Sequence, residues 1–525
     1  MRKTVKKLTA VGLTVTSVLG LVACGSSKGT TSQGTSENKE VTKPDTFTVM
    51  CDGTVVTETN GAEAFYKQLN EATGLDIKWT RPDHASYYDA VANAFNSDDT
   101  MPDVVLLSSD YYALYASNGF LWNMTDAWEH SETKNSGRLI STADNVLSAL
   151  MVNGEDGTKA MYGLSLYRGN GCCTYVKKAW LDKAGIDASK VKDVQMDFNT
   201  YYGYLKQMAQ TMGHYVISSP GFIHPEAPNT NYLPEFYQKA QYTFYKDTSG
   251  KYVDGFAQQE MKEALQRIQT AVNDGVIDKE SVNNSTANAR DKFYSTDPST
   301  ETGVFTYWAG TWANTLKTNL ANKGLDDELI AIKPMKELGA YTERIAPCWC
   351  ITSAAKNPEG IFKYFIDKML DGGDVQMLWT HGAKGTHWDD KAETVTVEKK
   401  EDQPKTYTEG QFHYLPGIEK PDQWQTKNHI DPILSIANFT NGYVGESLIP
   451  EVARENGEFF AENSQVAVPL PMTSELSNNI GDINTARTYV IAQVALGYMT
   501  VDEGMDYYNK TVGSLSNAVL KSLNK

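Results

Sequence analysis

Residues 47–107 contain three short apolar segments, Phe-Thr-Val-Met-Cys at 47–51, Leu-Asp-Ile-Lys-Trp at 75–79 and Val-Val-Leu-Leu at 104–107. Two segments with helical periodicity separate them, with apolar residues at Ala62, Phe65, Leu69 and Ala72 and then at Tyr88, Val91, Ala92 and Phe95. This alternation of strands and helices is typical of a parallel sheet with crossover helices. The stretch therefore predicts an α/β fold.

Polar residues follow each of the three predicted strands. In a parallel sheet, ligands bind beyond the carboxyl ends of the strands. The candidates there are Asp52 after the first strand, Arg81 and Asp83 after the second, and Asp110 and Tyr111 after the third. Each is either a ligand contact or an ordinary solvated loop residue.

The composition limits the classes of partner. The chain has 525 residues and a formal net charge of −17, which argues against a nucleic-acid partner and against an anionic membrane surface. The length exceeds what one hydrophobic core usually serves, so we expect two domains or lobes. With 10 Trp and 29 Tyr, the chain is rich in aromatic side chains that suit partly polar ligands, although many of them also fit a core.

The first residues predict secretion and a lipid anchor. Basic residues at positions 2–7 precede an apolar run, Leu8 to Leu21, which is too short to span a bilayer comfortably. The run ends in Leu21-Val22-Ala23-Cys24, which resembles the lipobox of bacterial lipoproteins. The resemblance implies that residues 1–23 are a cleaved signal peptide and that Cys24 is acylated. The alternative is an ordinary signal peptide with a chance cysteine. Residues 24–44 are polar and predict a flexible linker.

Five further cysteines remain after Cys24: Cys51, Cys172, Cys173, Cys348 and Cys350. Because five is an odd number, at least one thiol stays free in a monomer. Neither close pair has further Cys or His at the spacing of a zinc site. We interpret the five as small buried apolar residues rather than redox or metal groups.

Several motifs then follow one another in an order that resembles family 1 extracellular solute-binding proteins of ABC importers, a resemblance that covers nearly all of the chain beyond the linker. The matching segments are Met101-Pro102-Asp103-Val104-Val105, Asp110-Tyr111-Tyr112, Gly119 to Thr125, Met161-Tyr162-Gly163-Leu164, Tyr175 to Ile186, Gly303 to Trp312, Tyr364 to Asp367, and Gly382 to Trp388. They are similar to the family patterns "PD(V/I)", "GxLxxLT", "YGLP", "YNKDWLDKLGI", "GxxAMxxxGxW" and "YGxEGxHY". The last pattern occurs in longer members, which often bind oligosaccharides.

The resemblance implies a two-lobed, periplasmic-binding-protein-like clamshell whose lobes are joined by hinge-crossing strands. We place lobe 1 at residues 45–164 plus 351–440 and lobe 2 at 165–350 plus 441–525. The implied function is capture of a carbohydrate and delivery to ABC permease subunits driven by a cytosolic ATPase. The implied location is the outer face of the cytoplasmic membrane of a Gram-positive type cell, with the lipid as the only membrane contact. We expect a monomer without a cofactor. We also expect no metal, because residues 187–197 lack the alternating Asp and Asn of the calcium loop that some relatives contain.

A sugar site needs aromatic platforms beside polar side chains. The resemblance places a ligand-stacking aromatic at the turn that holds Trp308 and Trp312. Other candidates lie near the predicted crossings or in loops, namely Trp349, Arg168, His387, Trp388 and Trp424. For each tryptophan the alternative is a place in the core or an unrelated exposed site.

The rival classes are a binder of peptides or other solutes on the same fold and a tethered extracellular enzyme. The sequence contains no Gly-x-Ser-x-Gly, His-Glu-x-x-His or P-loop motif. Glycosidases need only two suitably spaced carboxylates, so no motif excludes them. The resemblance favours a binder without catalytic residues.

Overall fold

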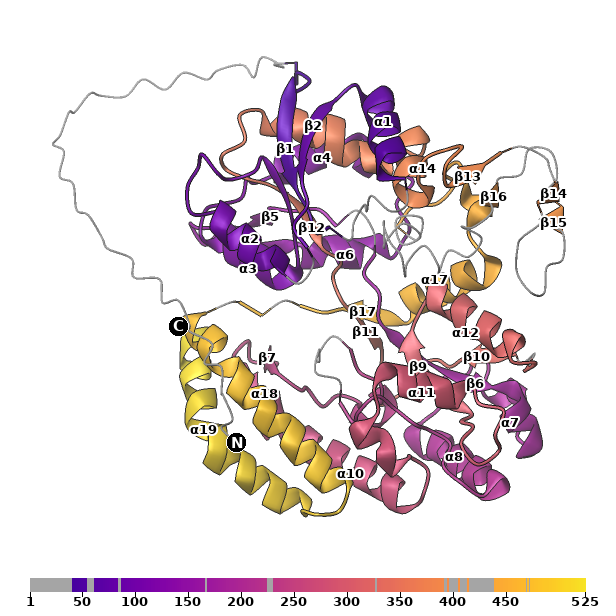
Figure 1. The fold of residues 1–525 in the computed structure, drawn as a ribbon. Helices are drawn as coiled ribbons and strands as arrows, with labels where there is room; N and C mark the ends of the chain where they lie inside the picture. Colours follow the sequence, from indigo (N-terminus) through magenta and orange to yellow (C-terminus); the bar gives the residue numbers. More distant parts are fainter. Residues whose placement is uncertain are drawn as a thin grey trace, which may run out of the picture. The chain divides into compact units, whose positions relative to one another are not determined.

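The structure is a computed structural model, and it describes residues 40–53, 61–83, 86–165, 168–223, 230–325, 328–390, 394–395, 405–406, 413–414, 439–468, 470–471 and 473–525. Most of the described helices and strands are arranged around two β-sheets, one of four strands and one of three, and each sheet packs against hydrophobic core of its own lobe (Figure 1). We call the elements around the four-stranded sheet the first lobe and those around the three-stranded sheet the second lobe. None of the described helices combines the length and the apolar character that crossing a membrane requires.

The first lobe is built on four strands in the order β12-β3-β1-β2. β1 (Thr46–Met50) pairs in parallel with β2 (Asp76–Thr80) and with β3 (Val104–Leu107). β12 (Cys348–Ile351) pairs antiparallel with β3 and returns from a distant part of the chain. The parallel pairing predicted for the first three strands is confirmed.

Helices and short hairpins complete the first lobe. α1 (Ala62–Thr73) buries Phe65 and Leu69 as predicted, and it ends at Gly74, whose φ of 61° is easy only for glycine. The other elements are α2 (Tyr87–Ala94), α3 (Ser109–Ser117), α4 (Thr125–Glu129), α5 (Glu132–Asn135), α6 (Ala143–Ala149), β4 (Met151–Asn153), β5 (Lys159–Met161), α13 (Pro358–Ile361) and α14 (Asp374–His381). Short strand pairs follow, β13 (Trp388–Asp389) with β16 (His413–Tyr414) and β14 (Thr394–Val395) with β15 (Lys405–Thr406).

The second lobe is built on β6 (Cys172–Lys177), which lies between β9 (Val304–Trp308) and β10 (Leu329–Ala331) and is antiparallel to both. All six residues of β6 are buried, because core lies on both faces of this strand. The surrounding elements are α7 (Lys178–Lys183), α8 (Phe198–Met212), α9 (Pro234–Tyr237), β7 (Phe244–Lys246), β8 (Tyr252–Asp254), α10 (Gln259–Asn273), α11 (Thr286–Phe293), α12 (Thr311–Asn322), β11 (Tyr341–Glu343), α17 (Glu451–Glu462) and β17 (Ser464–Val466).

Two long helices end the described chain, α18 (Ser474–Ala495) and α19 (Val501–Leu523). In the sequence, apolar residues follow helical spacing at 485–497, 501–510 and 512–523, which predicts three helical segments. The last two form one continuous helix, and α18 begins at Ser474. Asp254 joins both helices to β8, because its carboxylate accepts hydrogen bonds from Arg487 at 2.8 Å and from the Tyr508 hydroxyl at 2.7 Å. A buried carboxylate shared in this way fixes the helices against the lobe.

The five described cysteines are buried, and none of them forms a disulfide, as the sequence predicted. Burial raises the pKa of Cys51, Cys173 and Cys348 to about 12, so these thiols stay protonated and unreactive. A soluble form that starts after Cys24, denatured without reductant, is therefore expected to give five titratable thiols, and the native form close to none. A count of three or one in the denatured protein would contradict this assignment.

Candidate functional site

Charged residues lie at the carboxyl edge of the first-lobe sheet. Asp52 follows β1 and is half-buried, and Asp83 lies in the loop after β2 and is exposed. The guanidinium of Arg81, also after β2, lies 5.4 Å from the centroid of the Tyr66 ring. The structure therefore brings the predicted Asp52, Arg81 and Asp83 to one edge of the sheet, where open α/β sheets bind ligands.

A stacked tyrosine pair lies beside this edge. The rings of Tyr88 and Tyr111 are parallel within 5°, with centroids 3.9 Å apart, and both residues are half-buried. The backbone N–H of Ser108, directly after β3, donates to the Tyr88 hydroxyl at 2.8 Å. Burial raises the pKa of Tyr88, so its hydroxyl remains a neutral hydrogen-bonding group. The predicted Asp110 lies in α3, and its side chain is outside the described part.

The predicted buried face of the second helix is confirmed at Val91 and Phe95 and was wrong at Tyr88 and Ala92. Tyr87 is buried in place of Tyr88, and its hydroxyl donates to the carbonyl of Leu106 at 2.6 Å. Ala92, predicted to be buried, is exposed. Adjacent residues of a helix point about 100° apart, so Tyr88 points away from the core that Tyr87 enters and lies beside the end of β3. Periodicity alone does not separate two adjacent tyrosines.

In the second lobe, a rigid turn connects β9 to α12. Gly310 has φ 65° and ψ −118°, which a residue with a side chain rarely adopts. Its N–H donates to the Asn456 side chain at 2.7 Å, and the Tyr175 hydroxyl donates to the same oxygen at 3.0 Å. The Asn170 side chain donates to the Ala309 carbonyl at 3.1 Å. These contacts hold the turn from two separate parts of the chain, residues 170–175 and α17.

The turn carries Trp308 and Trp312, which are both half-buried. The guanidinium of Arg344 lies 4.5 Å from the Trp308 ring centroid, and that of Arg290 lies 5.2 Å from the Trp312 ring centroid. Trp312 also packs edge-on against Tyr307 at 5.0 Å. A small hollow of about 30 Å³ opens at this turn, lined by Arg168, Gly169, Asn170, Ala309, Gly310, Thr311, Gly457 and Phe460.

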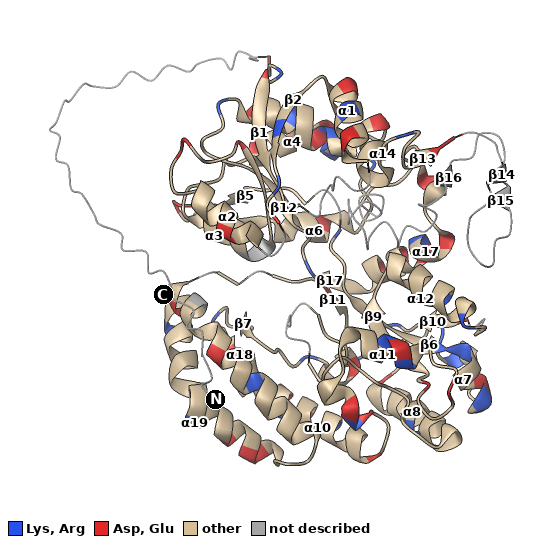
Figure 2. Cartoon of the chain, in the orientation of Figure 1, with Lys and Arg blue, Asp and Glu red and all other residues tan. Residues whose placement is uncertain are grey.

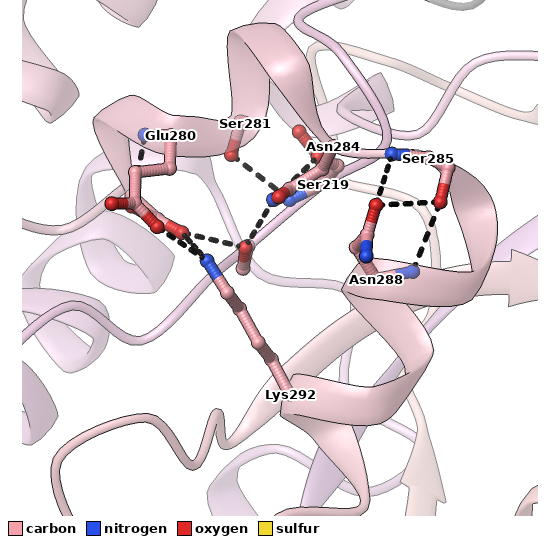
Figure 3. A network of polar contacts seen from close by, with 9 residues as sticks. Ser219, Glu280, Ser281, Asn284, Ser285, Asn288 and Lys292 are labelled. Carbon is pink, nitrogen blue, oxygen red and sulfur yellow. Dashed lines mark hydrogen bonds and ion pairs between the residues drawn. The ribbon is translucent and has the colours of Figure 1, made fainter.

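A polar network fixes the loop at residues 218–223 of the second lobe (Figure 3). Lys292 bridges Asp278 at 2.7 Å and Glu280 at 3.0 Å, and the Asn284 side chain donates to the Ser218 hydroxyl at 2.8 Å. Residues 220–223 of this loop, together with the start of α11 and part of α18, line a hollow of about 370 Å³. The network thus gives one wall of that hollow a fixed shape.

Three segments run side by side where the chain passes between the two sheets. They are residues 164–171 (without 166 and 167, which are not described), residues 341–349 and residues 464–467. We call them the crossing ribbon. Leu164 and Trp349 exchange backbone hydrogen bonds of 3.0 Å, and β11 pairs in parallel with β17. Gly169 and Gly171 allow this closeness, because a Cβ at Gly169 would lie 1.4 Å from the Arg344 carbonyl oxygen.

Arg168 lies inside the crossing ribbon, where it forms a buried ion pair with Glu343. It also donates to the Thr142 carbonyl at 3.0 Å, and the Ser464 hydroxyl donates to Glu343 at 3.1 Å. Burial raises the pKa of Glu343, while Arg168 opposes that shift. The predicted Arg168 therefore joins the segments of the ribbon to one another.

The remaining predicted residues lie away from the strand edges or outside the described part. Trp349 is buried in the first-lobe core against Phe365 and Trp379, which is the core alternative left open by the sequence. His387 and Trp388 are also buried. The His387 ring accepts a hydrogen bond from the Ala383 N–H at 2.7 Å, and the Trp388 ring donates to the Gly382 carbonyl at 2.8 Å. Trp424 and Cys24 lie outside the described residues.

Three residues that lie at the first-lobe strand ends or at the turn after β9 were not predicted as site residues from the sequence, namely Tyr88, Arg290 and Arg344. Arg290 lies 22 positions before Trp312, and Arg344 lies 36 positions after Trp308, so no local pattern connects them. Within the described ranges, no three His, Cys, Asp or Glu side chains come together in a way that could hold a metal ion.

No protein-family model and no curated protein sequence matches this chain. Solved structures do match. The sugar-binding protein MalE from Xanthomonas citri superposes with a TM-score of 0.58 at 12% identity, over 91% of this chain and 100% of that one. A solute-binding protein from Bifidobacterium longum infantis, described as HMO-binding and ABC-transporter-associated, gives 0.57 at 14% identity, over 91% and 98%.

A third structure, an extracellular solute-binding protein of family 1 from Alicyclobacillus acidocaldarius, gives a TM-score of 0.56 at 14% identity, over 92% of this chain and 100% of that one. These neighbours are solute-binding proteins and not enzymes. At such identities the likeness establishes the fold alone. The predicted α/β fold class is confirmed, and this chain has the two-lobed fold of the family 1 extracellular solute-binding proteins.

Proposed function

We propose that this protein captures a carbohydrate, most simply an oligosaccharide, outside the cell and delivers it to an ABC permease. The observation that carries the proposal is the placement of aromatic side chains at the edges of both sheets, Tyr88 and Tyr111 on the first lobe and Trp308 and Trp312 on the second. Aromatic rings suit the apolar C–H faces of sugars. The solved structures with the same fold include proteins described as sugar-binding and HMO-binding, which supports the same ligand class.

The mechanism we propose is a population shift. The protein exchanges between open and closed arrangements of its lobes, and a ligand that touches both lobes only in the closed arrangement favours closure. Charged groups beside the aromatic rings, such as Asp52 and Asp83, accept hydrogen bonds from sugar hydroxyls. The closed form then docks on the permease, and a cytosolic ATPase drives transport. No step of this mechanism breaks a covalent bond.

We further propose that acylated Cys24 holds the protein at the outer face of the cytoplasmic membrane, with residues 24–44 as the linker. The support is the sequence Leu21-Val22-Ala23-Cys24 after a basic and then apolar start. Mass spectrometry of the membrane-extracted protein tests this directly. The expected N-terminal peptide begins at a diacylglycerol-modified Cys24, and an unmodified Cys24 or a different cleavage site would contradict the anchor.

A thermal-shift panel of glycans and peptides tests the proposed function. A cognate saccharide is expected to raise the unfolding temperature by several degrees, because a ligand present at about 100 times its dissociation constant contributes roughly 2.7 kcal/mol. Small-angle scattering with that saccharide is expected to show a smaller radius of gyration. Thin-layer chromatography of the same mixture is expected to show unchanged saccharide.

Each other outcome has a definite meaning. Stabilisation by peptides with none by glycans would replace the carbohydrate with another solute class. Product formation would identify an enzyme and contradict the proposal. A saccharide that binds without compaction would contradict the closure mechanism while leaving the ligand class intact.

A further inference from the structure

Two arginines lie against the two tryptophans at the end of β9. Arg344, an exposed residue directly after β11, lies over Trp308, and Arg290 of α11 lies over Trp312 and within 5.6 Å of the Tyr307 ring centroid. Figure 2 shows basic residues on α11. The two cations come from different segments, yet both reach the same turn.

Neither arginine has a carboxylate partner in the part of the chain that the structure describes. The Arg290 side chain donates to the Tyr307 hydroxyl at 3.2 Å, and the guanidinium of Arg344 makes no hydrogen bond or ion pair with a described residue. The carboxylate next in sequence, Glu343, is taken by Arg168. The first turn of α12, which begins at this site, contains no acidic residue.

Other arginines of the chain are satisfied by the protein itself. Arg487 pairs with Asp254 at 2.8 Å and Arg454 with Glu458 at 3.1 Å, while Arg267 donates to the Phe236 carbonyl at 2.7 Å. The whole chain carries 65 acidic residues against 48 basic ones. What distinguishes Arg290 and Arg344 is that two guanidinium groups without a carboxylate partner among the described residues lie at one turn, and this concentration of positive charge in an acidic protein suits an anionic partner.

The position of Arg344 over the Trp308 ring suits such a partner. Contact with the ring face leaves the planar N–H edge of a guanidinium available, and this edge matches the two oxygens of a carboxylate. A sugar ring beside the indole would bring a carboxylate on that sugar close to the guanidinium. We propose that the saccharide bound at this site is acidic, and that a uronic or sialic acid carboxylate pairs with Arg344, with Arg290 adding positive charge at Trp312.

The test compares charged saccharides with neutral counterparts of the same size, and it rests on the proposed function. Isothermal titration uses short uronic acid oligosaccharides of several linkages and sialylated lactose, each beside its carboxyl methyl ester. Esterification removes the charge and keeps the ring and linkage. The acidic form is expected to bind at least about tenfold more tightly than its ester, and added salt is expected to reduce that advantage.

Two variants locate the effect. Arg344→Gln and Arg290→Gln are expected to weaken binding of the acidic saccharide about tenfold or more, and to leave binding of the methyl ester nearly unchanged. Arg454→Gln removes an arginine that is already paired on α17 and serves as the matched control, with no change expected for either ligand. Equal circular dichroism spectra and melting temperatures of the unliganded variants exclude a folding defect.

Failure of this inference differs from failure of the proposed function. Equal affinity for acid and ester, or an acid preference that survives in both site variants, would overturn the acidic-ligand assignment while the carbohydrate proposal stands. A preference for sulfated over carboxylated saccharides would overturn the carboxylate assignment. Absence of binding by every charged and neutral saccharide would overturn both.

Discussion

Replacing Arg168 with Met is expected to lower the free energy of unfolding at neutral pH by about 3–5 kcal/mol, because it leaves the carboxylate of Glu343 buried without its partner. Arg168 is 4% exposed and Glu343 is fully buried. Burial already raises the pKa of Glu343, so the variant is expected to gain stability as pH falls and the carboxyl takes up a proton. Urea denaturation at several pH values measures both effects.

Two comparisons separate this ion pair from a general effect of lost charge. The double variant Arg168→Met, Glu343→Met removes both charges and is expected to recover most of the lost stability, because buried pairs are often replaceable by apolar residues. Arg454→Gln breaks an exposed pair with Glu458, at 38% and 61% exposure, and is expected to cost less than about 1 kcal/mol. A loss in Arg168→Met no larger than that control would show that the ion pair does not stabilise the ribbon.

The second large effect concerns Glu235 of α9, which lies fully buried in the second lobe and accepts a hydrogen bond from the Thr174 hydroxyl at 2.7 Å. Burial raises its pKa from 4.5 to about 7. In the unfolded chain the carboxyl loses its proton near pH 4.5, whereas in the folded chain it keeps the proton until about pH 7. The favourable contribution is therefore complete below pH 4.5 and is lost as pH rises through 7, by roughly 3 kcal/mol.

The variant Glu235→Gln is expected to remove this loss, because an amide has a similar shape and does not ionise. Urea denaturation at pH 5 and pH 7.5 gives the free energy of unfolding of the wild type and of the variant. The fall in this free energy between the two pH values is compared for the two proteins, and the difference is the contribution of Glu235. Glu458→Gln, an exposed change on α17, is the control and is expected to keep the wild-type pH dependence. Equal pH dependence in wild type and Glu235→Gln would contradict the buried, protonated state of Glu235.

Much of the fold follows from local patterns in the sequence. The apolar segments at 47–51, 75–79 and 104–107 became β1, β2 and β3, with a one-residue shift at β1 and at β2, because each is a short apolar run between turn residues. The alternation of strand and helix then fixed the parallel pairing. The C-terminal helices were predicted in pieces, because the first half of α18 has only the sparse apolar residues Leu476, Ile480 and Ile483 among polar ones.

The candidate site was harder to predict, because it depends on contacts between distant residues. Arg344 meets Trp308 and Arg290 meets Trp312 only after β9, β11 and α11 have packed. The pairing of Arg168 with Glu343 joins positions 175 residues apart. The sequence identified most of the strand-end candidates, but it could not tell which tryptophans lie at an edge and which, like Trp349, lie in the core.

The crossing ribbon also constrains the kind of motion that a ligand can induce. A single strand between two bodies permits rotation about its own axis. Three neighbouring segments, linked by backbone hydrogen bonds such as that from Arg344 to Asn170 at 3.1 Å, resist torsion and still permit bending. We therefore expect closure of the lobes to bend the ribbon rather than to twist it. Gly169 lets the neighbouring segments lie in contact, because a Cβ at this position would lie 1.4 Å from the Arg344 carbonyl oxygen.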